Sequence, residues 1–344
     1  MTLLYFIFVL GVTIFIHELG HFIFAKKAGI YVYEFSLGMG PRILSFKKKE
    51  TVYALRLFPI GGFVQMAGEE IEEDENIPKE MRMQSKTWLQ RFLTVIAGVV
   101  FNFLLAILLL FIIGLVNGAP TNTPYLTKIY KEYPAHESGL KEGDQITHFN
   151  GEKIRSSDML LLDMQVSSEK SISLTVKHED GKTETIKIKP KKEVDGDKIS
   201  YKYGFSVGNQ IERGIGPSIK YAFTKTGSLL NQMVHIIGYL CTGKLGLDNL
   251  AGPIGIYSIV GESARAGFIN IVFLIAYLCV NVGFINLLPI PAFDGGRILF
   301  MIIEKIKGSP VSAKTENIIH SIGMIFLMIL MVVITCYDIM RLFG

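Results

Sequence analysis

Residues 3–25 read LLYFIFVLGVTIFIHELGHFIFA, an apolar run that is interrupted by two histidines and one glutamate. A helix of about 20 apolar residues spans a hydrocarbon layer that is ~30 Å thick. No basic residue precedes the run, and Lys26-Lys27 follows it where a signal peptide has a small-residue cleavage site. The sequence therefore predicts a retained membrane helix that carries ionisable groups within the bilayer.

Three further apolar runs are long enough to cross a membrane: Phe92 to Val116, about Phe268 to Leu288, and Ile318 to about Met340. The composition agrees, because 49% of the residues are hydrophobic and only 19% are charged. The predicted fold class is a multi-pass α-helical membrane protein with about four transmembrane helices. Such a chain contacts membrane lipid over much of its surface.

The basic residues predict the orientation. Lys26 to Arg91 contains 11 Lys and Arg, and Arg297 to Lys314 contains four, so the positive-inside rule places both segments in the cytoplasm. Both termini and the long segment after Val116 then lie outside. The net charge is +4 and the basic residues are spread along the chain, which predicts that no nucleic acid binds.

Two segments between the first two helices have distinctive patterns. Val52 to Met66 consists of two apolar runs around Pro59-Ile60-Gly61-Gly62, which predicts a β-hairpin that dips back toward the membrane. A small surface hairpin is the alternative. Backbone at membrane depth must be buried in protein or line a wet cavity. The acidic run from Glu69 to Glu75 predicts a solvated loop.

The soluble part of the chain follows the second helix. Residues 122–208 turn polar with alternating Thr, Ile, Val and Lys, which predicts an inserted β-rich domain. From Ser218 to Cys241 apolar residues recur at helical spacing, and we expect an amphipathic helix on the outer membrane surface. A helix packed against the soluble domain is the alternative. The predicted organisation is a membrane domain of residues 1–118 and 252–344, the domain 122–208 and the surface helix 217–243.

The motif His17-Glu18-Leu19-Gly20-His21 carries the chemistry. In a helix residues i and i+4 share one face, so both imidazoles can reach one zinc ion, and Glu18 is placed to act on a zinc-bound water. A polar patch that hydrogen-bonds to neighbouring helices is the alternative. Ionisable groups in a membrane span are costly unless they are paired, coordinated or solvated, which favours the metal site.

A catalytic zinc usually has three protein ligands and one open position. Asp294 is the best third candidate, because it follows a run in which two prolines and then two glycines break a helix near membrane depth. Asn286, at the start of that run, is expected to hydrogen-bond the oxyanion or to orient the substrate. The alternatives are a kinked helix end for Asp294 and a helix-to-helix hydrogen bond for Asn286.

These roles predict peptide hydrolysis in which Glu18 is the general base and zinc polarises the carbonyl. His17 lies nine residues before Lys26, so at ~1.5 Å per residue it lies roughly 13 Å below the cytoplasmic boundary. A substrate at that depth is itself a membrane segment, whose helix must unwind before a carbonyl is accessible. We expect the hairpin residues Gly61, Gly62, Phe63 and Val64 to pair with the unwound substrate backbone.

The chain resembles the site-2 protease family of intramembrane zinc metalloproteases, in particular its bacterial branch, the regulator-of-sigma-E proteases. Five motifs carry this resemblance in family order: His17-Glu18-x-x-His21, Phe35-Ser36-Leu37-Gly38-Met39-Gly40-Pro41, Pro59-Ile60-Gly61-Gly62-Phe63-Val64, Gly252-Pro253-Ile254-Gly255, and Asn286-x-x-Pro289-x-Pro291-x-x-Asp294-Gly295. The resemblance implies Zn²⁺ as cofactor and a bacterial plasma membrane location. It also implies single-pass transmembrane substrates that another protease has already shortened, such as anti-sigma factors, with remnant signal peptides as a further class of substrate.

The soluble segment resembles a PDZ domain through Tyr133-Pro134-Ala135, Ser138 to Ile146 and Asn150-Gly151. The chain has room for one such domain, whereas some family members carry two. Two other classes of function compete with the protease: a peptide-binding scaffold with a structural zinc, and a metal transporter. The intact Glu18 argues against a structural site. Asn102, Asn281 and His320 form no evident line across the membrane, which argues against a transporter.

Overall fold

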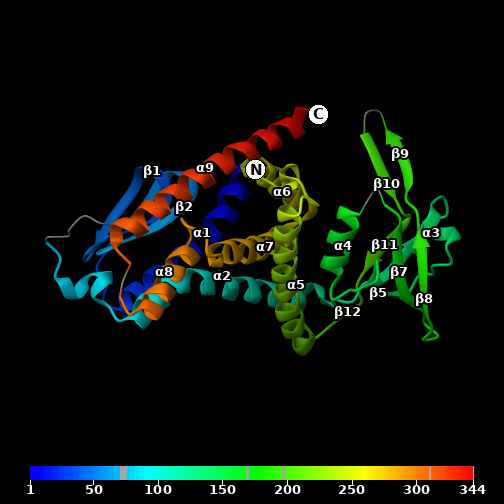
Figure 1. Cartoon of the computed structure of the whole chain (residues 1–344), viewed down its shortest axis with the longest axis horizontal. Coiled ribbons are helices and arrows are strands. Elements are labelled where there is room, and N and C mark those ends of the chain that lie inside the picture. Colours follow the sequence, from blue (N-terminus) through cyan, green and yellow to red (C-terminus); the bar gives the residue numbers. More distant parts are fainter. Residues whose placement is uncertain (70–75, 168–169, 196–197, 310, 344) are drawn as a thin grey trace. The chain divides into compact units, whose positions relative to one another are not determined.

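The computed structural model describes residues 1–69, 76–167, 170–195, 198–309 and 311–343, so most of the acidic run lies outside the described residues. The chain divides into two compact units, Met1–Leu109 with Leu247–Gly344, and Leu110–Gly246. Figure 1 labels their helices and strands.

Four helices of the described chain are long and apolar enough to cross a membrane. They lie in α1 (Thr2–Lys27), α2 (Trp88–Asn117), α7 (Phe268–Leu287) and α9 (Ala313–Phe343). Lys26 and Lys27 occupy the last turn of α1, where positive charge is favourable to the helix dipole. This arrangement confirms the predicted multi-pass fold.

Shorter helices complete the first unit. They are α6 (Pro253–Ala266), α8 (Asp294–Lys307) and 3-10 turns at Lys79–Met81, Met83–Ser85 and Leu247–Asn249. α6 packs against α1 and α7. Asp338 of α9 accepts a hydrogen bond from the Gly255 amide at 2.8 Å, so the Gly252-Pro253-Ile254-Gly255 motif joins the start of α6 to the last helix.

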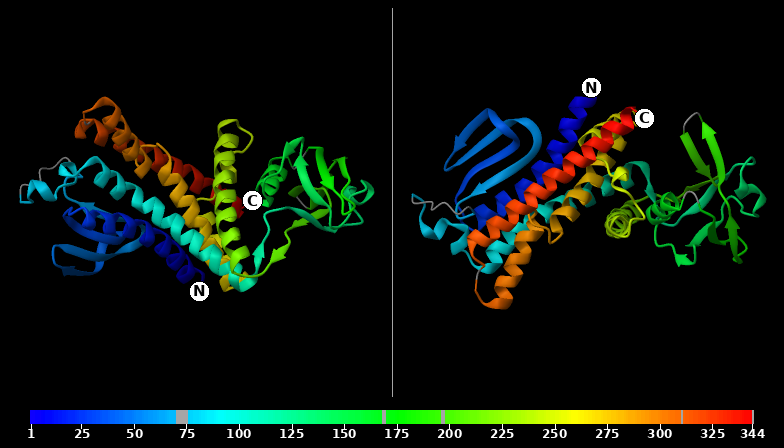
Figure 2. Two further views of the ribbon diagram at one scale, coloured as in Figure 1. Left: turned by 90° about the horizontal axis from the view of Figure 1, so that it is seen from below. Right: turned by 45° about the horizontal axis from the view of Figure 1, so that its top comes forward.

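A β-hairpin is present, but its two strands are not the two that the sequence predicts. β1 (Val32–Lys48) and β2 (Thr51–Met66) form an antiparallel sheet beside α1, joined through Lys49 and Glu50 (Figure 2). Phe35 pairs with Tyr53 near the start of β2 and also with Val64 near its end. The two apolar runs of β2 therefore pair with β1, and not with each other as predicted.

The sheet is fastened to the helices at one end and apolar at the other. A buried cluster at this end contains residues of α1, of β1 and β2, of α2 and of α8. Its members include Ala25, Val32, Phe35, Val64, Val95, Ile298 and Met301. At the far end the sheet exposes Met39, Ile43, Leu44, Phe46, Leu57 and Phe58, each more than half exposed. Apolar side chains gathered in this way are unusual on a water-facing surface.

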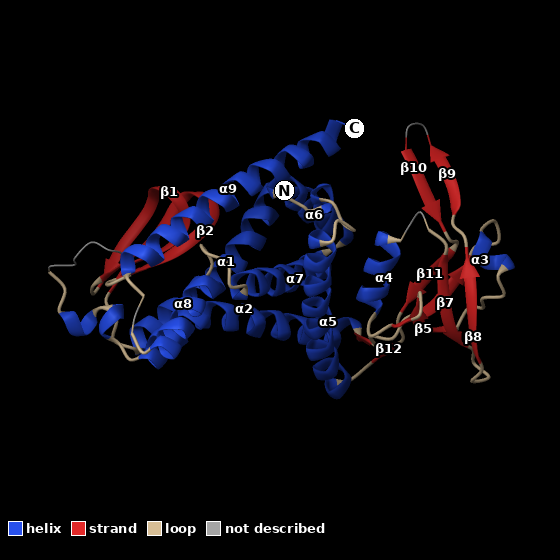
Figure 3. Cartoon of the chain, in the orientation of Figure 1, coloured by secondary structure: helices blue, strands red, loops and turns tan. Residues whose placement is uncertain are grey.

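The second unit contains the β-rich domain, whose strands are red in Figure 3. Its main sheet has the order β11-β4-β5-β7-β8, formed by Phe205–Gly208, Tyr125–Ile129, Gln145–Phe149, Ile172–Lys177 and Thr183–Ile188, with β6 (Glu152–Lys153) on β5. Alternate residues of β7 are buried, as expected for a strand with one face on a core. That core lies between Leu126 and Tyr203 and is independent of the membrane helices.

Smaller elements surround this sheet. β9 (Lys191–Asp195) pairs with β10 (Lys198–Lys202), and the domain also contains α3 (Pro134–Glu137) and α4 (Ser157–Val166). β3 (Ala119–Pro120) pairs with β12 (Ile211–Glu212), so the two ends of the inserted segment meet.

α5 (Ile215–Cys241) packs against α4. Asp158 of α4 contacts Lys225 and Ser228, both at 2.6 Å, and Asp163 accepts a hydrogen bond from Tyr239 at 2.7 Å. The helix therefore packs against the soluble domain, which is the alternative that the sequence leaves open for this amphipathic segment. The opposite face of α5 exposes Ile219, Phe223 and Val234, and its placement on a membrane surface stays a prediction.

Candidate metal centre

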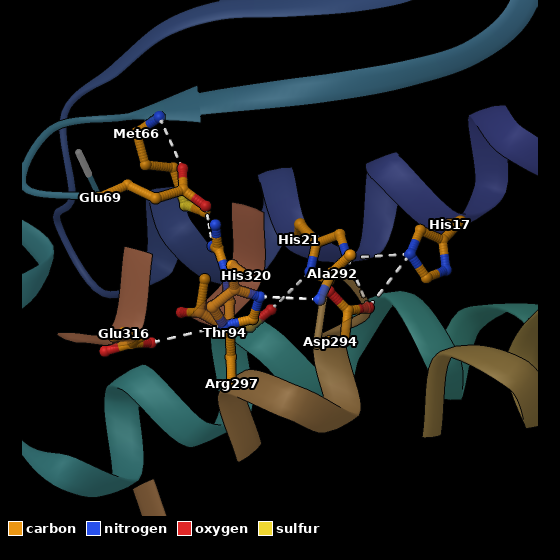
Figure 4. A network of polar contacts seen from close by, with 10 residues as sticks. All are labelled: His17, His21, Met66, Glu69, Thr94, Ala292, Asp294, Arg297, Glu316 and His320. Atoms are coloured by element: carbon orange, nitrogen blue, oxygen red, sulfur yellow. Dashed lines mark hydrogen bonds and ion pairs between the residues drawn. The ribbon is translucent and has the colours of Figure 1, made fainter. Parts of the chain in front are cut away.

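Three predicted metal ligands converge in the structure. His17 and His21 lie one turn apart on α1, and Asp294 is the first residue of α8 (Figure 4). Asp294 Oδ2 lies 3.2 Å from His17 Nε2 and 3.3 Å from His21 Nε2, and the two Nε2 atoms are 3.1 Å apart. Both histidines are buried and Asp294 is largely buried.

These separations fit a tetrahedral ion. Nitrogen and oxygen ligands bind zinc at about 2.0–2.1 Å, which places neighbouring ligands of a tetrahedron about 3.3 Å apart. The Asp294 Oδ2 atom is buried and accepts no hydrogen bond within the described residues. An oxygen of this kind that faces two ring nitrogens is satisfied by a cation bound between them or by a proton on one of the rings.

Both histidine rings are oriented by residues of α2. Nδ1 of His21 lies 2.9 Å from the Thr94 carbonyl oxygen, to which it can only donate, so Nε2 keeps its lone pair for a metal. Nδ1 of His17 lies 3.2 Å from the amide nitrogen of Asn102, whose Oδ1 is buried without a hydrogen-bond partner in the described chain. Turning this amide over lets Oδ1 accept from Nδ1 of His17, which is the arrangement that a metal on Nε2 requires.

α2 approaches the two rings closely because it has a glycine there. A Cβ added at Gly98 would lie 2.3 Å from His21 Nε2 and 2.8 Å from His17 Cε1. Small residues at helix contacts allow such approach in membrane proteins. Gly98 therefore makes room for the centre.

The loop before α8 presents Asp294. α7 ends at Leu287, and Leu288 takes the extended conformation that a following proline favours. Ala292 has a φ of 80°, and its amide donates a hydrogen bond to His320 Nδ1 of α9 at 2.9 Å. A Cβ at Gly295 would lie 2.1 Å from the Leu288 carbonyl oxygen, so the loop folds tightly onto the start of α8.

The three side chains line a cavity of about 1160 Å³ together with Glu18 and Asn286. Several other polar residues line it, namely Glu69, Arg91, Arg297, Glu304, Glu316, Asn317 and His320. These side chains can hydrogen-bond water molecules in the cavity, which hydrolysis at the buried centre requires.

The predicted substrate-binding residues lie at one wall of this cavity, with one exception. Gly62, Phe63 and Val64 line it, and a Cβ at Gly62 would lie 3.1 Å from Cγ of Glu18. Gly61 lies against Met39 instead. Asn286 donates a hydrogen bond to Val282 in its own helix at 2.9 Å, which leaves its second amide hydrogen for another acceptor.

An ion pair connects this wall to α8. Arg297 pairs with Glu69, which follows β2, and the Glu69 carboxylate also accepts a bond from the Met66 amide. The end of β2 is thereby attached to the helix that begins with Asp294.

Four contributions to the centre were missed in the sequence: the Thr94 carbonyl, Gly98, Asn102 and His320. Backbone carbonyls carry no sequence signal. Asn102 and His320 are single polar residues in apolar runs, and an intramembrane polar residue is a reason to look for a partner.

The comparisons with known proteins agree over almost the whole chain. The family model described as Peptidase family M50 matches residues 5–330. The chain is 35% identical to zinc metalloprotease RasP of Bacillus licheniformis and 34% identical to regulator of sigma-W protease RasP of Bacillus subtilis, each over 99% of both chains. It is 32% identical to zinc metalloprotease RasP of Geobacillus kaustophilus, over 98% of this chain and 97% of the relative.

The alignments with both Bacillus proteins extend over 419 residues, so these relatives contain insertions relative to the 344 residues here. A solved PDZ domain of an SdrC-like protein from Listeria monocytogenes also matches, with 22% identity and a TM-score of 0.22, over 25% of this chain and 88% of that one. The family match and the full-length relatives confirm the resemblance seen in the sequence. The chain belongs to peptidase family M50, the site-2 protease family, and is a zinc metalloprotease.

Proposed function

We propose that this enzyme hydrolyses peptide bonds within the transmembrane segments of single-pass membrane proteins that another protease has already shortened. The observation that carries the proposal is the convergence of His17, His21 and Asp294 at a water-accessible cavity among apolar helices. A metalloprotease centre in this position acts on chains that lie in the membrane. The name of the Bacillus subtilis relative, regulator of sigma-W protease, supports anti-sigma factors as substrates.

In this proposal His17, His21 and Asp294 hold the zinc ion, which supplies a Lewis acid and lowers the pKa of a water molecule. Glu18 removes the proton from the water and returns it to the leaving amine. Asn286 directs its free amide hydrogen toward the oxyanion. The His21–Thr94 and His17–Asn102 contacts keep the two imidazoles in the tautomer that the metal needs.

The end of β2 binds the unwound substrate. Phe63 and Val64 have their register partners, Ser36 and Phe35, on one side only among the described residues, and both residues line the cavity. An open strand edge offers hydrogen bonds to a substrate backbone that has lost its helical ones. Gly62 allows the strand to pass close to Glu18, because a Cβ there would lie 3.1 Å from Cγ of Glu18.

The proposed location is the bacterial plasma membrane. Residues 26–91 and 297–314 are cytoplasmic by their positive charge, which leaves both termini and the β-rich domain outside. The exposed apolar end of the β1–β2 sheet fits a position that reaches into the bilayer from the cytoplasmic side. The proposed domain boundaries are those predicted from the sequence, with the β-rich domain at residues 122–208.

A cleavage assay on a model transmembrane peptide in detergent tests the proposal. The purified enzyme is expected to cut within the apolar segment, to lose activity with a chelator and to regain it with added zinc. Glu18→Gln is expected to retain zinc and to lose cleavage, because the amide keeps the shape of the side chain but accepts no proton. Cleavage by Glu18→Gln at the parent rate would reject this mechanism.

A further inference from the structure

The backbone just before Asp294 is held in a costly conformation. Ala292 has a φ of 80°, in the left-handed region that a residue with a Cβ adopts only at an energetic cost. Such a conformation persists only where the surrounding structure enforces it. Ala292 lies two residues before Asp294, so its conformation sets the direction in which the carboxylate points.

α9 supplies the enforcing contacts from outside the loop. His320 Nδ1 accepts the Ala292 amide hydrogen at 2.9 Å, and the Phe300 ring packs on the imidazole with a centroid distance of 5.7 Å. One turn after His320, Gly323 lies close to Pro291, the residue before Ala292: a Cβ at Gly323 would be 2.6 Å from the Pro291 carbonyl oxygen. One hydrogen bond and one close approach therefore hold Pro291 and Ala292 against the last membrane helix.

The hydrogen bond also fixes the tautomer of His320. An amide can only donate, so Nδ1 carries no hydrogen and the neutral ring is protonated on Nε2. Nε2 is buried and has no hydrogen-bond partner within the described chain; the nearest carboxylate oxygen, on Glu316, is 3.9 Å away. The hydrogen bond that His320 makes among the described residues is therefore the one to the loop, and Figure 4 shows it together with the longer 3.9 Å contact to Glu316.

We propose that His320 is a positioning residue of the metal centre: by accepting the Ala292 amide it holds the loop that delivers Asp294 to zinc. This inference rests on the proposed function, in which Asp294 is a ligand. It assigns His320 no contact with substrate or metal. The hydrogen bond from Ala292 to His320 positions Asp294 through the backbone of the loop. The ligands His21 and His17 are instead oriented by contacts of their own rings.

Zinc release to a chelator, measured on the full-length protein in detergent, tests the proposal without reference to activity. Asn places its Oδ1 where His has Nδ1, whereas Gln places its polar atoms near Nε2. His320→Leu and His320→Gln are therefore expected to release zinc about 10- to 100-fold faster, the range seen when outer-shell partners of a metal ligand are removed. His320→Asn is expected to release it at close to the parent rate.

A second substitution tests the link through the backbone. Glycine adopts a positive φ without cost, so Ala292→Gly introduced into His320→Leu is expected to restore part of the zinc retention. If His320 merely fills space, the added glycine restores nothing. Thr335→Val is the control on the same helix, because the hydroxyl of Thr335 donates a hydrogen bond to the Met331 carbonyl one turn away in its own helix. It is expected to leave zinc release unchanged.

The outcomes separate this inference from the proposed function. If Asp294→Ala keeps its zinc, the ligand assignment itself is wrong. If Asp294→Ala loses zinc while His320→Leu holds it as tightly as the parent, only the role of His320 is wrong. Should His320→Leu fail to fold, the Asn and Gln variants decide, and equal zinc release from those two overturns the proposal.

Discussion

His17 Nε2 and Asp294 Oδ2 lie 3.2 Å apart, one on the first membrane helix and the other at the start of α8. If both atoms bind zinc, His17→Ala, His21→Ala and Asp294→Ala each remove one of three ligands and are expected to lose the metal together with activity. Zinc content by elemental analysis of the purified proteins measures this, with Glu18→Gln as the zinc-loaded reference. A full zinc content in Asp294→Ala removes that residue from the ligand set.

Gly98→Ala is expected to displace both histidines and abolish zinc binding. The added methyl group would lie 2.3 Å from His21 Nε2, within the space of the ligand atoms. Alanine otherwise stabilises a helix interior by about 1 kcal/mol over glycine, so a loss reports the site and not the helix. Gly11→Ala is the matched control, because a Cβ there meets nothing within 4 Å. Equal zinc content in the two variants contradicts the close packing described here.

Asn102→Leu is expected to weaken zinc binding about 10- to 100-fold, because His17 loses the partner that fixes its ring. Asn102→Asp presents only acceptor oxygens to Nδ1 of His17 and is expected to bind zinc at least as tightly as the parent. Competition with a chromogenic chelator measures both. Tighter binding by the Leu variant than by the Asp variant contradicts the proposed orientation of the Asn102 amide.

Proline in the open strand of β2 tests substrate pairing. Successive residues of an edge strand direct their N–H groups alternately toward the partner strand and away from it. Of Phe63→Pro and Val64→Pro, one therefore removes a hydrogen bond to β1 and lowers stability, and the other removes a donor from the open edge. The second is expected to lower kcat/KM about tenfold, equivalent to ~1.4 kcal/mol, with zinc content unchanged. Parent kinetics in both variants reject the pairing.

The stability of the β-rich domain is expected to depend on pH through His178. Its Nδ1 lies 2.7 Å from a carboxylate oxygen of Asp144, and this hydrogen bond raises the pKa of His178 above its usual value. The stabilisation is therefore complete below the unfolded-state pKa of about 6.5 and is lost as the pH rises through the higher folded-state pKa.

Thermal unfolding of residues 119–212, which contain their own core, measures the effect. The midpoint is expected to be higher at pH 6 than at pH 8.5 by a margin that shrinks in His178→Asn. His148→Asn is the control, because the His148 ring contacts a hydroxyl, that of Thr147. An identical pH dependence in the parent and in His178→Asn contradicts the assignment.

Local patterns were predictable from the sequence. Contacts between distant segments were not, apart from that of Asp294 with the two histidines, which follows from the need of a catalytic zinc for a third ligand. His17 and His21 share a helix face because their spacing alone determines it. β1 was missed because its run, which contains Gly38, Gly40 and Pro41, lacks the alternation that marks a strand, and its pairing with both ends of β2 depends on the fold. His320 was considered only as a step in a transport path, because nothing in its neighbourhood on α9 indicates that it meets Ala292.

The pairing of β3 with β12 has a consequence for how this protein changes during evolution. Ala119 and Glu212 are neighbours across this short ladder, so the chain leaves for the β-rich domain and returns at one point. A gene can therefore gain, lose or exchange coding sequence between these residues without altering the spacing of the helices that carry the catalytic groups. Insertions and replacements between β3 and β12 can therefore change substrate specificity while the residues that carry out hydrolysis stay the same.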